Sequence, residues 1–172
     1  MGKILGNASK PYAKVQWRGV TVDQRTKSAL KWAEKRYIAV APNKRKPWRF
    51  GQGSYNAGGV TASAGTHDGG GVVDIMFAGV PAKQRKATVK WLRKAGFAAW
   101  AREGALWGAN GSNDHAHAVL RGHRTASKGA KDQMLAYDAH RDGLAGGRWD
   151  GTWRPKRRRR WSHKQNKPVL GK

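Results

Sequence analysis

The chain has 172 residues, a length that suits one domain, with 38% hydrophobic residues and 23 glycines. Its 35 Lys and Arg against 10 Asp and Glu give a formal net charge of +25, so polyanions such as nucleic acid, an anionic cell wall or an anionic membrane are the expected partners. The absence of cysteine excludes disulfides, thiolate metal sites and a cysteine nucleophile, and no apolar run approaches the length of a membrane span.

The first third of the chain predicts one helix between irregular segments. Residues 1–20 form an irregular basic lead-in that lacks the apolar core of a signal peptide, so we expect the protein to be made in a cytoplasm. A capping signal at Thr21 and Gln24 opens a helix to about residue 37, and the short apolar run 38–41 predicts a strand. Residues 51–71 are rich in Gly, Ser, Ala and Thr and predict a long functional loop.

The middle of the chain alternates strands and helices. Strands are predicted over residues 72–77, 97–102 and 115–120. A helix over residues 81–95 begins at Pro81 and ends at Gly96, and a weaker helix covers 128–140. The pattern predicts an α+β domain over residues 1–152, with a small antiparallel sheet and flanking helices.

The C-terminal segment is strongly basic. Residues 153–172 hold nine Lys or Arg and no Asp or Glu, which predicts a flexible tail. Three tryptophans near it either stack on sugars or bases or cover the edge of the core: Trp149, Trp153 and Trp161. Three isolated histidines are expected on the surface or in caps: His123, His140 and His163.

Two short segments gather three of the six histidines and three of the ten acidic residues: Gly65–Asp74 and Asn113–His117. In a chain this basic, such grouping predicts a divalent metal, because imidazole and carboxylate are ordinary zinc ligands. On a strand, His115 and His117 project from the same face. The alternatives are that Asp74 pairs with an Arg or Lys, and that the histidines lie on a solvated edge strand.

Three protein ligands are typical of a catalytic zinc site. We take His67, Asp74 and His117 as candidate Zn²⁺ ligands and Asp114 as the candidate general base and acid. His115 would orient or polarise the substrate, or stabilise a developing oxyanion.

The spacing His67-x6-Asp74 with Gly70 between, followed by Asp114-x2-His117, resembles the zinc D-alanyl-D-alanine carboxypeptidases and L-alanyl-D-glutamate endopeptidases. This group of peptidoglycan peptidases is related in fold to the hedgehog signalling domain. The resemblance spans about residues 20–150 and is closest to actinobacterial and actinophage members. The stretches that carry it outside the metal motif are Gln52–Asn56, Gly96–Trp100 and Arg141–Leu144.

The resemblance implies the same three zinc ligands, with Asp114 as acid and base and His115 beside the zinc water. Substrate contacts are expected from Gln52, Ser54 and Tyr55 in the long loop, and Trp107 is a candidate wall of the cleft. Gly65 and Val72 depart from the Ser and Ala of the family pattern, and Arg49 is the candidate for the family's substrate-binding arginine.

The resulting hypothesis is a monomeric zinc peptidase that cuts peptidoglycan stem peptides. It would be phage-encoded or bacterial, act at the cell wall as a lysis or virion-associated enzyme, and cling to anionic wall polymers or membrane through its basic tail. The alternative is a basic nucleic-acid-binding or phage structural protein without catalytic activity, for which the run Arg157–Arg160 and neighbouring tryptophans would bind phosphates and bases.

Overall fold

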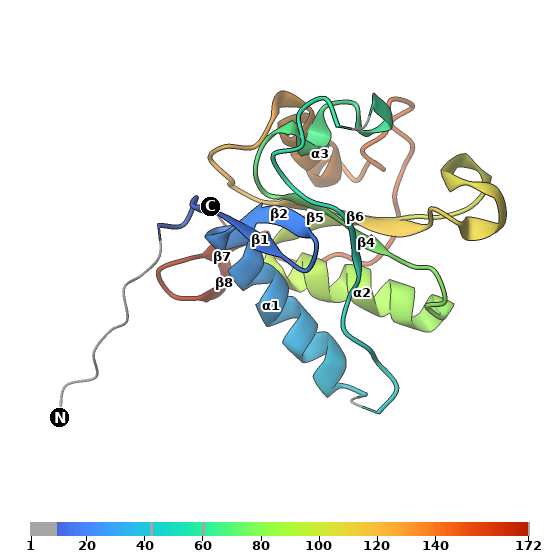
Figure 1. Ribbon diagram of the computed structural model, residues 1–172, viewed down its shortest axis with the longest axis horizontal. Helices are drawn as coiled ribbons and strands as arrows, with labels where there is room; N and C mark the ends of the chain where they lie inside the picture. Colours follow the sequence, from blue (N-terminus) through green and yellow to red (C-terminus); the bar gives the residue numbers. More distant parts are fainter. Residues whose placement is uncertain (1–9, 42, 60, 172) are drawn as a thin grey trace.

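The computed structural model describes residues 10–41, 43–59 and 61–171. A four-stranded antiparallel sheet lies at its centre, in the order β3 (Phe50–Gln52), β4 (Val72–Met76), β6 (His115–Leu120) and β5 (Phe97–Arg102). Helices α1 (Gln24–Ala39) and α2 (Ala82–Ala95) cover one face, and α3 (Lys128–Asp138) lies on the other (Figure 1). The predicted α+β class, with a small antiparallel sheet and flanking helices, is confirmed.

Two hairpins and four short 3-10 helices complete the described chain. The hairpins are β1 (Lys14–Trp17) with β2 (Val20–Asp23), and β7 (Arg159–Ser162) with β8 (Lys167–Leu170). The 3-10 helices are η1 (Thr61–Ser63), η2 (Thr66–Asp68), η3 (Ala105–Trp107) and η4 (Ala109–Gly111). No helix within the described ranges combines the length and apolar character that a membrane crossing requires.

The N-terminal half differs from the expectation in three places. The predicted irregular lead-in contains the β1–β2 hairpin over its described part, whereas residues 1–9 lie outside the described residues. Helix α1 is capped by Asp23, whose carboxylate accepts the Thr26 backbone N–H at 2.8 Å, rather than by Thr21. The strand predicted over residues 38–41 is wrong, because Ile38 and Ala39 form the last turn of α1 and Ile38 packs against the core.

Alternation along the central strands divides the interior into two layers. In β6, Ala116, Ala118 and Leu120 point into the main core beneath α1 and α2, while Val119 packs towards α3. Every residue of β6 is buried, so both faces of the strand are covered. The imidazoles of His115 and His117 therefore emerge on the α3 face of the sheet.

The C-terminal segment differs from the predicted flexible tail, because residues 159–170 form the β7–β8 hairpin against α1 and α2. Trp161 is 1% exposed and belongs to the main core, with its ring centroid 6.3 Å from that of Trp32. The backbone of Arg160 passes so close to Gly96 that a Cβ there would lie 2.9 Å away. Of the two roles considered for Trp161, the structure supports the packing role.

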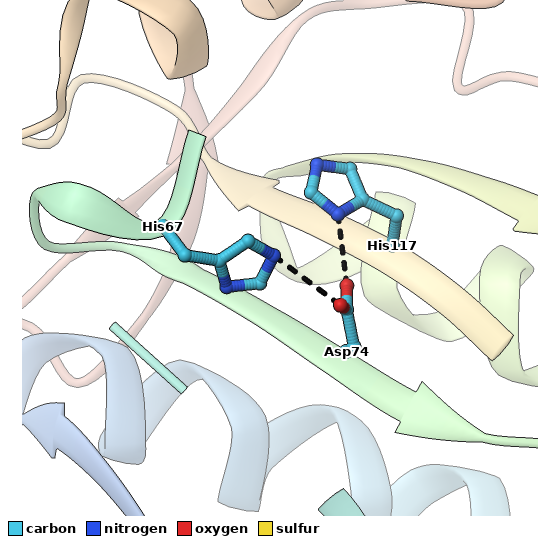
Figure 2. A group of neighbouring side chains, drawn as sticks. All are labelled: His67, Asp74 and His117. Atoms are coloured by element: carbon cyan, nitrogen blue, oxygen red, sulfur yellow. Dashed lines mark hydrogen bonds and ion pairs between the residues drawn. The ribbon is translucent and has the colours of Figure 1, made fainter. Parts of the chain in front are cut away.

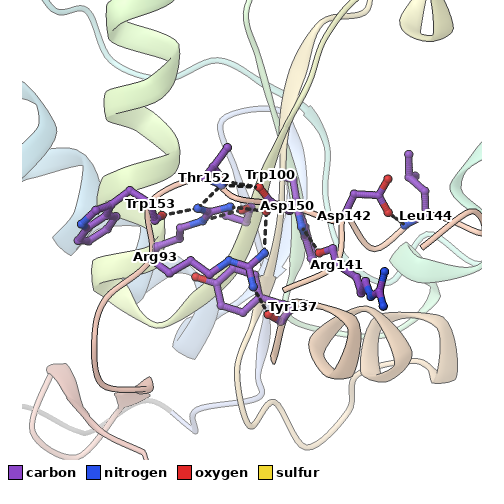
Figure 3. Close-up of polar contacts among 11 residues, drawn as sticks. Arg93, Trp100, Tyr137, Arg141, Asp142, Leu144, Asp150, Thr152 and Trp153 are labelled. Carbon is purple, nitrogen blue, oxygen red and sulfur yellow. Dashed lines mark hydrogen bonds and ion pairs between the residues drawn. The ribbon is translucent and has the colours of Figure 1, made fainter. Parts of the chain in front are cut away.

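Buried ion pairs attach the segment before this hairpin to the domain. The Asp150 carboxylate pairs with Arg93 of α2 at 3.1 Å and with Arg154 at 2.7 Å (Figure 3). Asp150 also accepts the Thr152 backbone N–H at 3.0 Å. Asp150, Thr152 and Arg154 all belong to the segment that leads into β7. Their contacts with one another and with Arg93 hold the start of the basic segment in a fixed position.

We predict that Trp161→Ala lowers the free energy of unfolding by about 3–5 kcal/mol, because it removes a fully buried aromatic ring. Trp149→Ala is the matched control; its ring is 67% exposed, so the expected change is within about 0.5 kcal/mol. Urea unfolding followed by circular dichroism measures both. Equal effects of the two substitutions would mean that the hairpin does not contribute to the core.

Candidate metal centre

A cavity of about 640 Å³ opens over the face of the sheet that carries α3. Its wall contains the three candidate ligands and His115. The four residues that were expected to contact substrate line it as well: Gln52, Ser54, Tyr55 and Trp107. The structure therefore brings together eight of the nine predicted site residues, with Asp114 as the exception.

The antiparallel register arranges the polar side chains of this wall in two neighbouring rows. Across the sheet these rows are Gln52, Asp74, His117 and Trp100 in the first, and Met76, His115 and Arg102 in the second. Side chains opposite one another in an antiparallel pair lie about 5 Å apart at Cβ. The first row thus places the Asp74 carboxylate directly beside the His117 imidazole.

His67 reaches the same point from the glycine-rich loop. The loop is joined to the preceding segment by two backbone hydrogen bonds, from Tyr55 N–H to Gly69 O and from Asn56 N–H to His67 O, both 2.9 Å. A Cβ at Gly70 would lie 2.4 Å from the Tyr55 hydroxyl, so this close approach requires glycine. The glycine run thereby positions a loop histidine over a strand aspartate.

The three candidate ligands converge on one point (Figure 2). The Asp74 carboxylate lies 3.3 Å from His67 Nε2 and 2.8 Å from His117 Nδ1. One ligand atom from each residue lies within 4.8 Å of the other two, and both imidazoles are buried. This buried group could hold a metal ion.

Oxygen atoms behind both imidazoles determine which ring nitrogens face Asp74. His67 Nδ1 lies 2.7 Å from Gly53 O, and His117 Nε2 lies 2.7 Å from Gln133 Oε1. The Gln133 amide is oriented in turn, because its Nε2 donates to Gly143 O at 3.2 Å. Since these oxygens only accept, a proton on each rear nitrogen satisfies them, and the front nitrogen of each imidazole faces Asp74, where a metal ion could bind.

The charges at this point favour a cation. Burial alone would raise the pKa of the Asp74 carboxyl, but His117 and His67 hold that pKa well below its usual range. Burial lowers the pKa of His117, although Asp74 acts in the opposite direction. The ionised carboxylate is buried between two imidazoles, and a shared dication would compensate its negative charge. The nitrogen, nitrogen and oxygen donors with their supporting oxygens fit a divalent metal ion.

Asp114 lies apart from this group. Its carboxylate contacts Arg85 of α2 at 2.7 Å and accepts the Gly104 backbone N–H at 3.1 Å, and it does not line the cavity. Asp114 directly precedes β6 and is one residue out of phase with His115, so its side chain points towards α2. Asp114 was expected beside the candidate metal ligands, but it is not found there, because Arg85 and the Gly104 backbone N–H bind its two carboxylate oxygens.

Of the loop residues that were expected to contact substrate, two use their polar atoms in hydrogen bonds within the protein and one does not. The Ser54 hydroxyl is 1% exposed and bonds to Val72 on both sides, donating to its carbonyl at 2.8 Å and accepting its N–H at 3.0 Å. The Tyr55 hydroxyl lies 3.2 Å from Asp23, towards which it donates. Gln52 Nε2 is buried without a hydrogen-bond partner among the described residues. Only Gln52 of these three has an uncommitted polar atom.

Two other residues lie elsewhere than expected. Arg49 donates to Ala78 O at 2.7 Å and does not line this cavity, so it is not placed to act as its substrate arginine. His123, which was expected on the surface or in a cap, is 3% exposed and lies 2.8 Å from Asp23. This buried pair anchors the start of α1 beneath the glycine-rich loop.

Two supporting residues, Gln133 and Arg102, were not predicted from the sequence. Gln133 comes from α3, and no motif links it to a histidine 16 residues earlier. Arg102 is the last residue of β5, and only the strand register places it beside His115. Trp100 and Arg102 are two residues apart and therefore share one face of β5. Only the pairing of β5 with β6 shows that this face also carries His115 and His117.

We predict that Gln133→Leu weakens the binding of a divalent metal ion about 10- to 100-fold, because His117 loses the acceptor that sets its ring orientation. Gln165→Leu on the exposed β7–β8 turn is the matched control and should leave the affinity unchanged. Competition with a chromophoric chelator measures both constants. An unaltered affinity for Gln133→Leu would show that the contact with Gln133 does not support metal binding by His117.

Comparison with known proteins assigns no family to the chain. No protein-family model matches it, and neither a curated protein nor a solved structure does. The cavity wall and the spacing of its residues therefore carry the functional assignment.

Proposed function

We propose that the protein is a zinc-dependent peptidase that cleaves peptidoglycan stem peptides, with a fold of the hedgehog and D-alanyl-D-alanine peptidase type. The observation that carries the proposal is the convergence of His67, Asp74 and His117 on the wall of a large cavity. Their spacing in the sequence, together with the downstream Asp114-x2-His117, is the pattern through which the chain resembles that family.

His67, Asp74 and His117 would hold the ion and leave its remaining coordination open to the cavity. Zn²⁺ bound there supplies Lewis acidity that polarises a carbonyl oxygen and acidifies water. The chain keeps the ligands in place through Gly53 and Gln133, which accept from the rear nitrogens of the two imidazoles. A cavity of about 640 Å³ is in the range that accommodates a short peptide.

His115 is the better-placed proton carrier in this geometry. Its Nδ1 lies 2.7 Å from Asn113 O, which places the proton on Nδ1 and leaves the Nε2 lone pair available. Nε2 lies 3.9 Å from the Asp74 carboxylate, on the cavity side of the sheet. His115 can therefore accept a proton from water in the cavity and return it to a leaving amine. The Trp107 ring, with its centroid 5.1 Å away, packs edge-on against this imidazole.

The basic surface supports action at an anionic cell wall. The chain carries a net charge of +25, and the β7–β8 hairpin presents arginines from a folded platform. Such a surface holds the protein near phosphate-bearing wall polymers or an anionic membrane and weakens as salt is added. Phage lysis or virion-associated wall hydrolysis is the role that combines this surface with a peptidase site.

We predict that the zinc-loaded chain cleaves amide bonds in purified peptidoglycan, that a chelator stops the reaction and that added zinc restores it. Mass spectrometry of the released muropeptides identifies the bond, whether internal or C-terminal in the stem peptide. His67→Ala, which removes one ligand, should lose both zinc and cleavage. Stoichiometric zinc without any change in muropeptides would reject the peptidase and keep the metal site.

The two candidate proton carriers are separated by conservative substitutions. We predict that His115→Gln lowers kcat about 100-fold or more while zinc content is retained, because the cavity loses its proton acceptor. Asp114→Asn should mainly reduce stability, because Arg85 loses its 2.7 Å partner. Steady-state kinetics and metal analysis of both variants decide between them. Loss of kcat in Asp114→Asn alone, with stability intact, would return the role to Asp114.

A nucleic-acid-binding function is the second candidate. A second cavity of about 590 Å³ is lined by Trp149, Trp153 and the arginines of residues 157–159, which combines aromatic faces with positive charge. This function predicts DNA binding that falls steeply with salt and does not depend on zinc. Salt titrations of DNA binding by the wild-type chain and His67→Ala would identify it.

A further inference from the structure

Arg102 is a buried cation without an ionic partner. Its side chain lines the main cavity, the residue is 4% exposed, and its Nη2 has no hydrogen-bond partner among the described residues. No carboxylate of the described chain lies within 4.0 Å of its guanidinium. Buried charges are normally paired, because an unpaired one loses its hydration without compensation.

Two indole rings hold the guanidinium in place. Its Cζ lies 5.2 Å from the Trp100 ring centroid and 5.7 Å from that of Trp107. Trp100 is fixed in turn by its Nε1–H, which donates to Arg141 O at 3.0 Å (Figure 3). Aromatic faces stabilise a cation but offer no acceptor for its N–H groups. The guanidinium is therefore positioned, and its donors remain available.

The burial of Arg102 has a measurable electrostatic cost. Burial lowers the pKa of Arg102 to about 10, although Asp142 and Asp74 act in the opposite direction. The side chain thus stays charged at neutral pH inside a wall that offers it no direct counterion. An anionic group that enters the cavity would recover this cost, and a neutral group would not.

The register places Arg102 next to the proposed reaction centre. Arg102 is directly opposite His115 in the β5–β6 pair, and His117 is two residues further along β6. Such diagonal neighbours on one sheet face are about 7–8 Å apart. Because one peptide residue spans about 3.3–3.6 Å, a group bound at Arg102 lies within one to three residues of a bond held at the metal.

We propose that Arg102 forms a carboxylate-binding subsite, which selects peptides with a free carboxylate close to the scissile bond. The substrate class rests on the proposed peptidase function, whereas the subsite itself rests on the unpaired guanidinium. A planar carboxylate matches the paired N–H groups of a guanidinium. Arg102 is a binding and specificity residue in this proposal, and no proton passes through it.

Direct binding tests the subsite without any need for catalysis. The full chain is titrated by calorimetry with N-acetyl-D-alanine and with N-acetyl-D-alanine amide, which differ only in the carboxylate. Both titrations are run with and without zinc, because the metal can bind carboxylates itself. In the wild type we expect the acid to bind at least about tenfold more tightly than the amide in both conditions.

Three variants locate the preference. Arg102→Gln should abolish the preference for the acid in the zinc-free chain, while Arg102→Lys should keep part of it. Arg36→Gln, which removes the same charge from α1 on the opposite side of the sheet, should change nothing. Thermal unfolding and zinc content verify that each variant is folded. Equal binding of acid and amide to the wild type, or an unchanged preference in Arg102→Gln, would overturn the proposal.

Kinetics separate this inference from the proposed function. With a stem peptide and its carboxamide counterpart, Arg102→Gln should raise KM for the acid about tenfold or more and leave KM for the amide unchanged. If the wild type cleaves no peptide but still prefers the acid, the subsite stands and the peptidase proposal falls. If cleavage occurs and Arg102→Gln discriminates between acid and amide as the wild type does, the subsite alone fails.

Discussion

The contact of one buried carboxylate with two imidazoles is the constraint on which the site depends. Asp74 lies between His67 and His117, and the proton of each ring is held on the far side by an oxygen of the chain. The two imidazoles keep the buried carboxylate ionised. The sheet register, the glycine-rich loop and α3 together hold the three side chains at one point, and the fold thereby maintains a buried negative charge that a cation could share.

Much of this arrangement follows from spacing alone. A period of two places His115 and His117 on one face of a strand, and an acid within an apolar run implies a buried partner. Pro81 and Gly96 mark the ends of α2, where Gly96 adopts the left-handed conformation at φ 102°. Local rules of this kind succeed because they depend on neighbouring residues and not on the rest of the chain.

The remaining features depend on contacts between distant segments. Asp114 was assigned to the metal side because it precedes the two histidines, but its phase relative to β6 depends on where the strand begins. Gln133 supports His117 across 16 residues, and no local pattern reports such a contact. In the C-terminal hairpin, the high positive charge obscured an alternation in which Trp161 points inward between Arg160 and Ser162. Composition described the surface of that hairpin and not its buried face.

Strand β6 has consequences for how the protein could diversify. Its odd-numbered residues supply His115 and His117 of the candidate site and Val119 beneath α3, whereas its even-numbered residues pack beneath α1 and α2, so neither set can vary alone. A single inserted or deleted residue would exchange the two sets and destroy core and site together. The loops around the cavity tolerate change more readily, at Leu144 and Ala145 for example, where side chains line the cavity without supporting the sheet. Libraries built at those positions would vary the cavity while His67, Asp74 and His117 stay in place.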